Sequence, residues 1–275
     1  MRRRVYRWVT RQLTRLVFGE YKALADIGMM GMPNASRVWF LVAGFFARLA
    51  FLRIVRCQWN HFDRIPKGGV IIASNHVSSA DPAMMASAIY PRSPRYMAKV
   101  ELFQKEPIIG YLFALSGAFP VRRGAGDRLA IREAERLLAN GAVVGMFPEG
   151  HRSDTGAMMQ AHSGTALLAL RTQVPVVAVG ITGSERMRAG WRSLIARTTV
   201  RMTASNPFVV RPKGARVTRD DIDAAHITIM RAIAEQLPPA YRGVYADLVD
   251  DDTDQDGRSG HIGDDKPGDK PGAAA

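Results

Sequence analysis

The sequence predicts an α/β fold with a central, mostly parallel sheet flanked by helices and an N-terminal membrane-associating helical segment. Apolar runs of strand length occur at residues 70–73, 142–147, 176–181 and 199–203. Stretches with helical patterns separate or follow them, at residues 127–138, 161–171 and 220–236, and Pro238 and Pro239 stop the last one. Strands that alternate with helices in this way favour a parallel sheet with functional loops at the strand ends.

The N-terminal region combines positive charge with apolar side chains. In residues 1–36, arginines alternate with apolar residues around Trp8, which predicts a basic amphipathic helix suited to a membrane surface. The alternative is a charged helix packed on the domain. Residues 38–55 are more apolar, but Arg48 interrupts them well before the roughly 20 residues that a spanning helix needs. We therefore predict that residues 1–56 form a monotopic or peripheral anchor on the cytoplasmic face of the cell membrane.

The charge of the chain is strongly positive and unevenly placed. The 38 basic and 25 acidic residues give a net charge of +13, although the acidic, apolar-poor segment 247–275 carries the opposite sign. We expect that tail to be disordered. A basic body suits an anionic membrane surface or phosphorylated substrates. Nucleic acid is not an expected partner, because the sequence has no zinc-ligand spacing and no basic recognition helix.

The only cysteine, Cys57, excludes an internal disulfide and fits a reducing compartment. A nucleophilic role is the alternative, but its neighbours belong to no nucleophile motif. We therefore interpret Cys57 as structural.

The first polar cluster follows the apolar run 70–73 and contains His76 and, five residues on, Asp81. If Ser78 or Ser79 opens a helix that contains Pro82, the turn can fold Asp81 back toward the imidazole. A carboxylate on one ring nitrogen fixes the tautomer and leaves the other free to accept a proton. This is half of a catalytic triad, and its missing nucleophile could be a substrate hydroxyl. The alternative is a structural histidine, such as an N-cap, at a strand end.

The second cluster, residues 147–153, follows the apolar run 142–146 and supplies Glu149, Gly150 and Arg152. Arg152 could hold a phosphate with its planar fork. Glu149 could accept hydrogen bonds from substrate hydroxyls or hold that arginine in place. The alternative is an ordinary turn with a solvated ion pair.

Two further blocks complete the pattern. Residues 99–123 contain Lys99, Glu101 and Leu102, and end in the pair Arg122-Arg123 before a glycine, which suits an anion site or, alternatively, a solvated turn. Residues 173–179 form a strand entered through Pro175, which we interpret as mainly architectural.

In this order, the four blocks resemble the glycerophospholipid acyltransferase family, specifically its 1-acylglycerol-3-phosphate acyltransferase (PlsC-like) branch. The similarity runs from about Val55 to Gly183, so the acyltransferase domain is expected at residues 57–246, between the anchor and the tail. Three positions depart from the common family pattern: Arg122 replaces an acid, His151 a threonine and Ala178 a proline. These departures concern the identity of the acyl acceptor rather than the type of reaction.

The resemblance implies transfer of a fatty acyl group from acyl-CoA or acyl-carrier protein to the hydroxyl of a lysophospholipid. The default acceptor is 1-acylglycerol-3-phosphate, which would give phosphatidic acid. His76 would be the general base and Asp81 its orienting carboxylate. The expected substrate-binding residues are Asn75, Arg123, Glu149, Gly150 and Arg152. No metal and no cofactor is expected, with the acyl thioester serving as co-substrate.

Other functions remain open at this level. Another lysolipid or a glycolipid could be the acceptor. A serine hydrolase or thioesterase needs a nucleophile elbow, and no Gly-x-Ser-x-Gly occurs in the chain. A non-catalytic lipid-binding protein would fit the basic N-terminus but gives no reason for the His76 and Asp81 pair.

Overall fold

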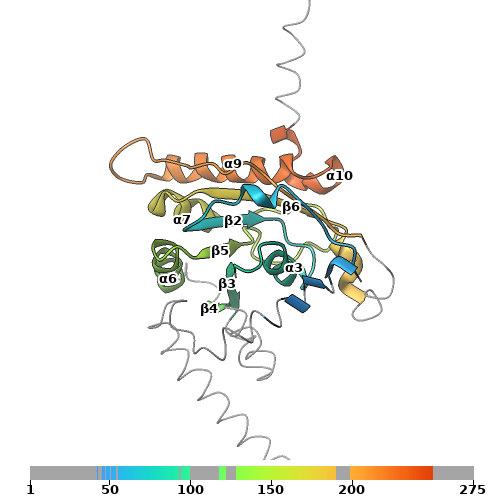
Figure 1. Cartoon of the computed structure of the whole chain (residues 1–275). Helices are drawn as coiled ribbons and strands as arrows, with labels where there is room; N and C mark the ends of the chain where they lie inside the picture. The colour runs from blue at the N-terminus through green and yellow to red at the C-terminus, as the bar shows by residue number, and fades with distance from the viewer. Residues whose placement is uncertain are drawn as a thin grey trace, which may run out of the picture.

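A seven-stranded mixed sheet forms the centre of the computed structural model (Figure 1). The structure describes residues 42, 45–46, 48–49, 51–53, 55–92, 94–99, 118–121, 128–189 and 199–249. The strands are β1 (Gln58–Asn60), β2 (Val70–Ser74), β3 (Pro94–Lys99), β4 (Phe119–Val121), β5 (Val143–Met146), β6 (Val176–Thr182) and β7 (Arg201–Ala204). Their order across the sheet is β1-β7-β6-β2-β5-β3-β4, which places β2 at the centre.

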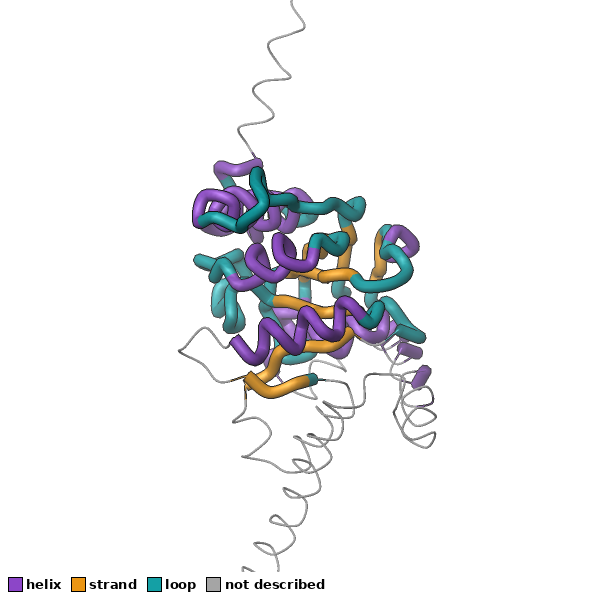
Figure 2. The backbone as a smooth tube through the Cα atoms, turned by 90° about the vertical axis from the view of Figure 1, so that its left-hand side faces the viewer, coloured by secondary structure: helices purple, strands orange, loops and turns teal. Residues whose placement is uncertain are grey.

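The described strand pairs are parallel except for β6 with β7, which is antiparallel. In the register, Ala73 of β2 lies opposite Met146 of β5 and Ala178 of β6. The carboxyl ends of these three central strands therefore meet at one edge of the sheet. The strands appear as a single stacked layer, orange in Figure 2. Loops at such an edge are where open α/β sheets place their ligands.

Helices cover both faces of the sheet. Successive side chains of a strand point to opposite faces, and the apolar ones on each face pack against helices. Ile71, Ala73 and Val144 lie in one core cluster with residues of α6 (Arg128–Ala139), α7 (Gly164–Thr172) and α9 (Arg219–Glu235). Val70, Ile72 and Val143 lie in the other cluster, with residues of α3 (Asp81–Ala88). The remaining helical elements are α10 (Pro239–Arg242) and the 3₁₀ turns η2 (Phe62–Arg64), η3 (Ser184–Ala189) and η4 (Gly243–Tyr245).

The predicted α/β fold with a mostly parallel sheet and flanking helices is confirmed, and the four predicted apolar runs correspond to β2, β5, β6 and β7. The predicted helix at residues 161–171 begins only at Gly164. Tertiary partners hold the backbone before it: the N–H of Ala161 donates to the Tyr245 hydroxyl, and the N–H of His162 to the carbonyl of Pro148. The predicted helix at residues 220–236 is present as α9 and starts with a capping box between Thr218 and Asp221.

The described part of the N-terminal segment is helical at several residues between 42 and 53 and lies beside α3 (Figure 1). Phe51 packs against the core, and Arg48 donates to the carbonyl of Ala88 at the end of α3. None of the helices in the described parts of the chain is long and apolar enough to cross a membrane. The predicted amphipathic helix at residues 1–36 lies outside the described residues.

The described part of the domain continues slightly past the predicted boundary at residue 246. Residues 247–249 are helical, and Leu248 and Val249 pack against the core that contains α9. The rest of the predicted acidic tail lies outside the described residues.

Candidate active site

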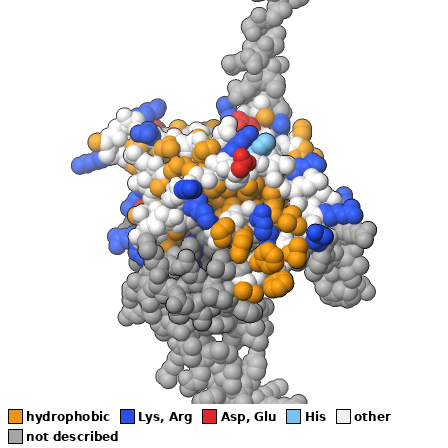
Figure 3. Space-filling model, viewed as in Figure 1, with side chains coloured by type: hydrophobic (Ala, Val, Ile, Leu, Met, Phe, Trp, Pro, Cys, Tyr) orange, Lys and Arg blue, Asp and Glu red, His pale blue; other side chains and the backbone are white. Residues whose placement is uncertain are grey.

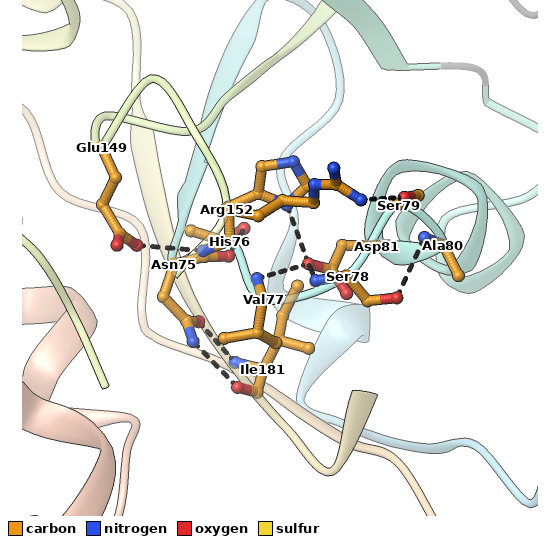
Figure 4. Close-up of polar contacts among 11 residues, drawn as sticks. Asn75, His76, Val77, Ser78, Ser79, Ala80, Asp81, Glu149, Arg152 and Ile181 are labelled. Atoms are coloured by element: carbon orange, nitrogen blue, oxygen red, sulfur yellow. Dashed lines mark hydrogen bonds and ion pairs between the residues drawn. The ribbon is translucent and has the colours of Figure 1, made fainter. Parts of the chain in front are cut away.

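His76 and Asp81 meet at the end of the central strand (Figure 4). Oδ2 of Asp81 lies 2.8 Å from Nδ1 of His76. The same oxygen accepts the backbone N–H groups of Val77 and Ser78, each at 2.8 Å. Asp81 is completely buried, whereas the His76 side chain keeps 16% of its surface exposed. The carboxylate therefore closes the turn and orients the imidazole with a single oxygen atom.

The turn differs in one respect from the predicted one, because neither serine is the N-cap of α3. Ala80 takes that position and makes no side-chain cap hydrogen bond, while Pro82 stands in the first turn. Ser78 instead accepts the N–H of Ala80 through its hydroxyl and the N–H of Asp81 through its carbonyl. The carboxylate of Asp81 is not a helix cap, because it accepts backbone N–H groups of the preceding loop rather than of the helix.

An aromatic column supports the imidazole from the neighbouring strands. The ring of Phe147, directly after β5, stacks on His76 with centroids 4.1 Å apart and an interplanar angle of 22°. Tyr96 of β3 stacks on Phe147 at 5.6 Å. Gly145 leaves room for this tyrosine, since a Cβ there would come within 2.1 Å of its ring. Phe147 belongs to the cluster at residues 147–153 but was not among the predicted site residues, although a large ring directly after a buried strand is a signal for such a contact.

Asn75 joins β2 to β6 by two hydrogen bonds to one residue. Its amide nitrogen donates to the carbonyl of Ile181 at 2.9 Å, and its amide oxygen accepts the Ile181 N–H at 2.8 Å. The residue is 1% exposed. The side chain thus continues the backbone ladder between the strands, just before His76. Its predicted contact with substrate stays a prediction, and the geometry favours a positioning role.

Glu149 is also buried and contacts backbone groups. Its Oε1 accepts the N–H of His76 at 3.0 Å, and its Oε2 accepts the N–H of Met159 at 2.9 Å. The alternative of a solvated turn with an ion pair is therefore wrong for this carboxylate, which is 1% exposed. Neither oxygen contacts Arg152, so the carboxylate does not hold that arginine in this structure.

Arg152 and Gly150 lie on the exposed side of the same loop. The guanidinium of Arg152 reaches across to the start of α3 and donates from Nη1 to the hydroxyl of Ser79 (Figure 4). This places a cation beside the imidazole with its outer face open to solvent. Gly150 has a φ of +72°, a left-handed conformation that favours glycine, and it forms the turn between Glu149 and Arg152.

Burial and charge change the acidity of two groups around His76. Burial raises the pKa of Glu149 to about 7, and the negative charge of Asp81 adds to the rise. The two backbone N–H groups on its oxygens act in the opposite direction. The pKa of Tyr96 is raised well above its ordinary value, first by burial and then by the charge of Asp81.

The fold thus brings Asn75, His76, Asp81, Glu149 and Arg152 together at the ends of β2 and β5. Arg123, the other predicted phosphate-binding residue, lies outside the described residues, as does most of its block. Within the described ranges, no group of three or more His, Cys, Asp or Glu side chains could hold a metal ion. The expected independence of metals and cofactors stays a prediction.

Comparisons with known proteins show which family the chain resembles. Residues 57–182 match the model of the Acyltransferase family. Over these residues the chain is similar to the family that its sequence motifs resemble. Its similarity is to the PlsC-like branch: it is 31% identical over 131 residues to the 1-acyl-sn-glycerol-3-phosphate acyltransferase of Bacillus subtilis (strain 168), which covers 46% of this chain and 64% of that protein.

Other relatives of this chain carry the same activity in their names. The human 1-acyl-sn-glycerol-3-phosphate acyltransferase beta is 32% identical over 112 residues, which cover 40% of either chain. The chloroplastic LPAT1 of Arabidopsis thaliana is 24% identical over 181 residues, covering 64% of this chain and 50% of that protein. The chain therefore spans less than two thirds of the length of these relatives.

A solved structure supports the fold. The crystal structure of the 1-acyl-sn-glycerophosphate (LPA) acyltransferase PlsC from Thermotoga maritima matches this chain with a TM-score of 0.53 and 20% identity. The match covers 85% of this chain and 98% of that one. At this identity, the likeness establishes the shared architecture alone.

Proposed function

We propose that this chain is an O-acyltransferase that moves a fatty acyl group from acyl-CoA or acyl-carrier protein to the hydroxyl of a lysophospholipid. The preferred acceptor is 1-acylglycerol-3-phosphate, and the product is then phosphatidic acid for phospholipid synthesis. The family and the names of its relatives support this activity. The observation that carries the proposal is the imidazole of His76, held by Asp81 through Nδ1 at a strand end.

The geometry suits base catalysis on a substrate hydroxyl. With its proton on Nδ1 facing Asp81, His76 presents a basic Nε2, which has no hydrogen-bond partner among the described residues. Nε2 takes the proton of the acceptor hydroxyl while its oxygen attacks the thioester carbonyl carbon. The carbon–sulfur bond then breaks, and the departing thiolate takes the proton back from the imidazolium. The buried carboxylate of Asp81 stabilises the cationic ring between these steps.

The exposed arginine supports binding of a phosphorylated acceptor. Arg152 stands beside His76 with its guanidinium at the surface, where the planar fork can donate hydrogen bonds to two phosphate oxygens. In the proposal, Arg123 contributes a second cation to the same phosphate. General base catalysis supplies about 10²–10⁴-fold, so holding both substrates against the imidazole supplies much of the remaining rate enhancement.

The proposed site of action is the cytoplasmic face of the cell membrane, with residues 1–56 as a monotopic or peripheral anchor. Large exposed apolar side chains on the segment between residues 42 and 52 support this membrane attachment. They are Val42, Phe45, Phe46, Leu49 and Leu52. Figure 3 shows apolar side chains gathered on this face of the molecule, with basic side chains around them. Such a surface suits insertion between lipid headgroups.

The decisive experiment is an acyl-transfer assay of the purified full chain. One acyl-CoA and one acyl-carrier protein are offered as donors, each against a panel of lysolipids that includes 1-acylglycerol-3-phosphate. Formation of phosphatidic acid supports the proposal. A preference for another lysolipid or a glycolipid would keep the acyltransferase activity but replace the proposed acceptor. Lipid binding without any acyl transfer would instead make the chain a non-catalytic lipid-binding protein.

A further inference from the structure

The peptide unit of His76 is held from both ends. Its N–H donates to Oε1 of Glu149 at 3.0 Å, and its carbonyl accepts the N–H of Ser153 at 2.8 Å. Both partners belong to the loop that follows β5, whereas His76 follows β2. The backbone that carries the imidazole is therefore tied to a second strand end, in addition to the contact of its ring with Asp81.

Glu149 continues this tie beyond His76. Its second oxygen accepts the N–H of Met159, ten residues further along the loop that leads to α7. One carboxylate thus bridges two N–H groups from segments that are 83 residues apart in the chain. A carboxylate suits this position because it is a pure acceptor on both oxygens. An amide would turn its NH₂ group toward one of the two N–H donors.

The same geometry leaves Glu149 unsuited to contact a substrate hydroxyl. The residue is 1% exposed, although it stands next to the exposed Gly150. A substrate could reach the carboxylate only if the loop opened and its two backbone hydrogen bonds broke. Arg152, three residues on, faces the solvent and is placed to meet a substrate.

Burying the Glu149 carboxyl group costs free energy, whereas a side chain that only filled this space would avoid that cost. Desolvation raises its pKa to about 7 even though two N–H groups favour the ionised form. A chain that only needed to fill this space could use an apolar or amide side chain. The presence of an acid here is therefore best explained by its hydrogen bonds to the N–H groups of His76 and Met159.

We infer that Glu149 is a positioning residue that fixes the backbone of His76, rather than a ligand of the acyl acceptor. The inference rests on the proposed function, in which His76 is the base. Its consequence is that Glu149 acts on the chemical step: it sets where the imidazole stands relative to the hydroxyl and the thioester. A displacement of about 1 Å in such a group costs about 100-fold in rate.

The test uses Glu149→Gln in the full chain, with Glu133→Gln as the matched control. Glu133 lies on α6, where it forms an ion pair with Arg136 on the same helix. We expect Glu149→Gln to lower kcat about 100-fold, while KM for 1-acylglycerol-3-phosphate changes less than about threefold. The control variant keeps both constants. A rise in acceptor KM of tenfold or more with kcat preserved would show a substrate ligand instead and overturn the inference.

A second variant distinguishes the effect of the two hydrogen bonds to Glu149 from the effect of its negative charge. Glu149→Asp keeps the negative charge but is one methylene too short to reach both N–H groups, so it also loses kcat. Wild-type kcat in this variant would mean that charge alone matters and would refute the bridging role.

Hydrogen exchange gives a readout that needs no activity. Amide exchange of the segment that contains His76 or Met159 should become roughly tenfold faster in Glu149→Gln, because one N–H loses a charged acceptor. Unchanged protection at both amides overturns the inference. If the wild-type chain transfers no acyl group to any acceptor, the proposed function fails, and the exchange result still decides whether Glu149 holds the loop.

Discussion

A single oxygen of Asp81, Oδ2, lies 2.8 Å from Nδ1 of His76 and also accepts the N–H groups of Val77 and Ser78. The carboxylate that orients the ring is therefore itself held by the loop that carries the ring. Because Asp81 is the first residue of α3, this arrangement ties the imidazole to the helix as well as to the end of β2. Orientation of the imidazole and closure of the turn depend on the same atom.

This dependence predicts different results for the two residues. His76→Ala should lower kcat by about 10²–10⁴-fold and leave the fold intact, because the ring is partly exposed and the buried Asp81 carboxylate keeps the N–H groups of Val77 and Ser78. Asp81→Asn should lower kcat at least about 100-fold and also destabilise the loop, because the amide can select the wrong tautomer and turn its NH₂ toward backbone donors. Steady-state kinetics and thermal unfolding measure the two effects. Turnover of either variant within tenfold of wild type at saturating substrate would rule out the assigned roles.

The sequence predicted the centre of this site because its signal is local. An apolar run that ends in polar residues marks a strand end, and the spacing of His76 and Asp81 needs only one tight turn to bring them together. The same applies to the strand before Glu149. Since parallel strands end at the same edge of a sheet, the adjacency of these two loops followed from the fold class.

The partners of Asn75 and Glu149 could not be predicted, because they are backbone groups far away in the chain. Ile181 and Met159 supply an N–H or carbonyl that any residue would supply, so no side-chain pattern marks them. The short strands β1, β3 and β4 were missed for a related reason. The β3 residues Arg95, Tyr96 and Met97 mix charge with apolar character, and only their neighbours in the sheet make them a strand.

The position of the Arg152 guanidinium beside His76 predicts that its substitution changes KM for the acyl acceptor. Arg152→Lys should raise KM for the phosphorylated lysolipid by about tenfold, because the ammonium keeps the charge but loses the bidentate fork. KM for the acyl donor should change much less. Arg219→Lys, at the exposed start of α9, is the matched control and should change neither constant. If only the donor KM rises, Arg152 binds the phosphate of the coenzyme or carrier protein.

The buried carboxyl of Glu149 predicts a pH dependence of stability. Its pKa in the folded chain is about 7, above the ordinary value of 4.5, so the native state binds a proton that the unfolded state releases between these values. The stability contributed by this group is fully present below about pH 4.5 and is lost as the pH rises through about 7, with a total of about 3 kcal/mol. Urea unfolding of wild type and Glu149→Gln at several pH values measures this as a difference that shrinks with rising pH. A difference that is constant from about pH 5 to about pH 8 contradicts the raised pKa.

The only cysteine offers a prediction about reactivity. Sγ of Cys57 is buried 3.7 Å from Sδ of Met84, and burial raises the pKa of the thiol to about 12. The thiolate fraction at neutral pH is then about a thousandfold lower than for an exposed thiol. Labelling with a thiol reagent should therefore be at least about 100-fold slower in the native chain than in denaturant. Equal rates in the two states would show that the site is open to solvent.

The exposed apolar side chains near residue 45 predict where the chain meets a membrane. Phe45 and Phe46 are 54% and 62% exposed, and they are on the segment that joins the basic N-terminus to the domain. Replacing both with serine should weaken binding to anionic liposomes by about tenfold or more, because each ring loses about 1.5–3 kcal/mol of burial in the interface. Removal of the anionic lipid should weaken wild-type binding as well, because the basic residues of the anchor contribute about 1 kcal/mol each near a charged surface.

A matched control comes from the opposite side of the fold, where α9 and η4 also expose large apolar residues. Ile227 and Val244 are 48% and 61% exposed, so their replacement by serine removes comparable surface without touching the anchor. Liposome co-sedimentation of the full chain should show normal binding for this control and reduced binding for the Phe45 and Phe46 variant. Since α9 covers the sheet face that α3 does not, the pair of variants distinguishes an oriented attachment from general stickiness (Figure 1). Equal losses in both variants would reject an oriented anchor, and no loss in either would place membrane binding outside residues 42–53.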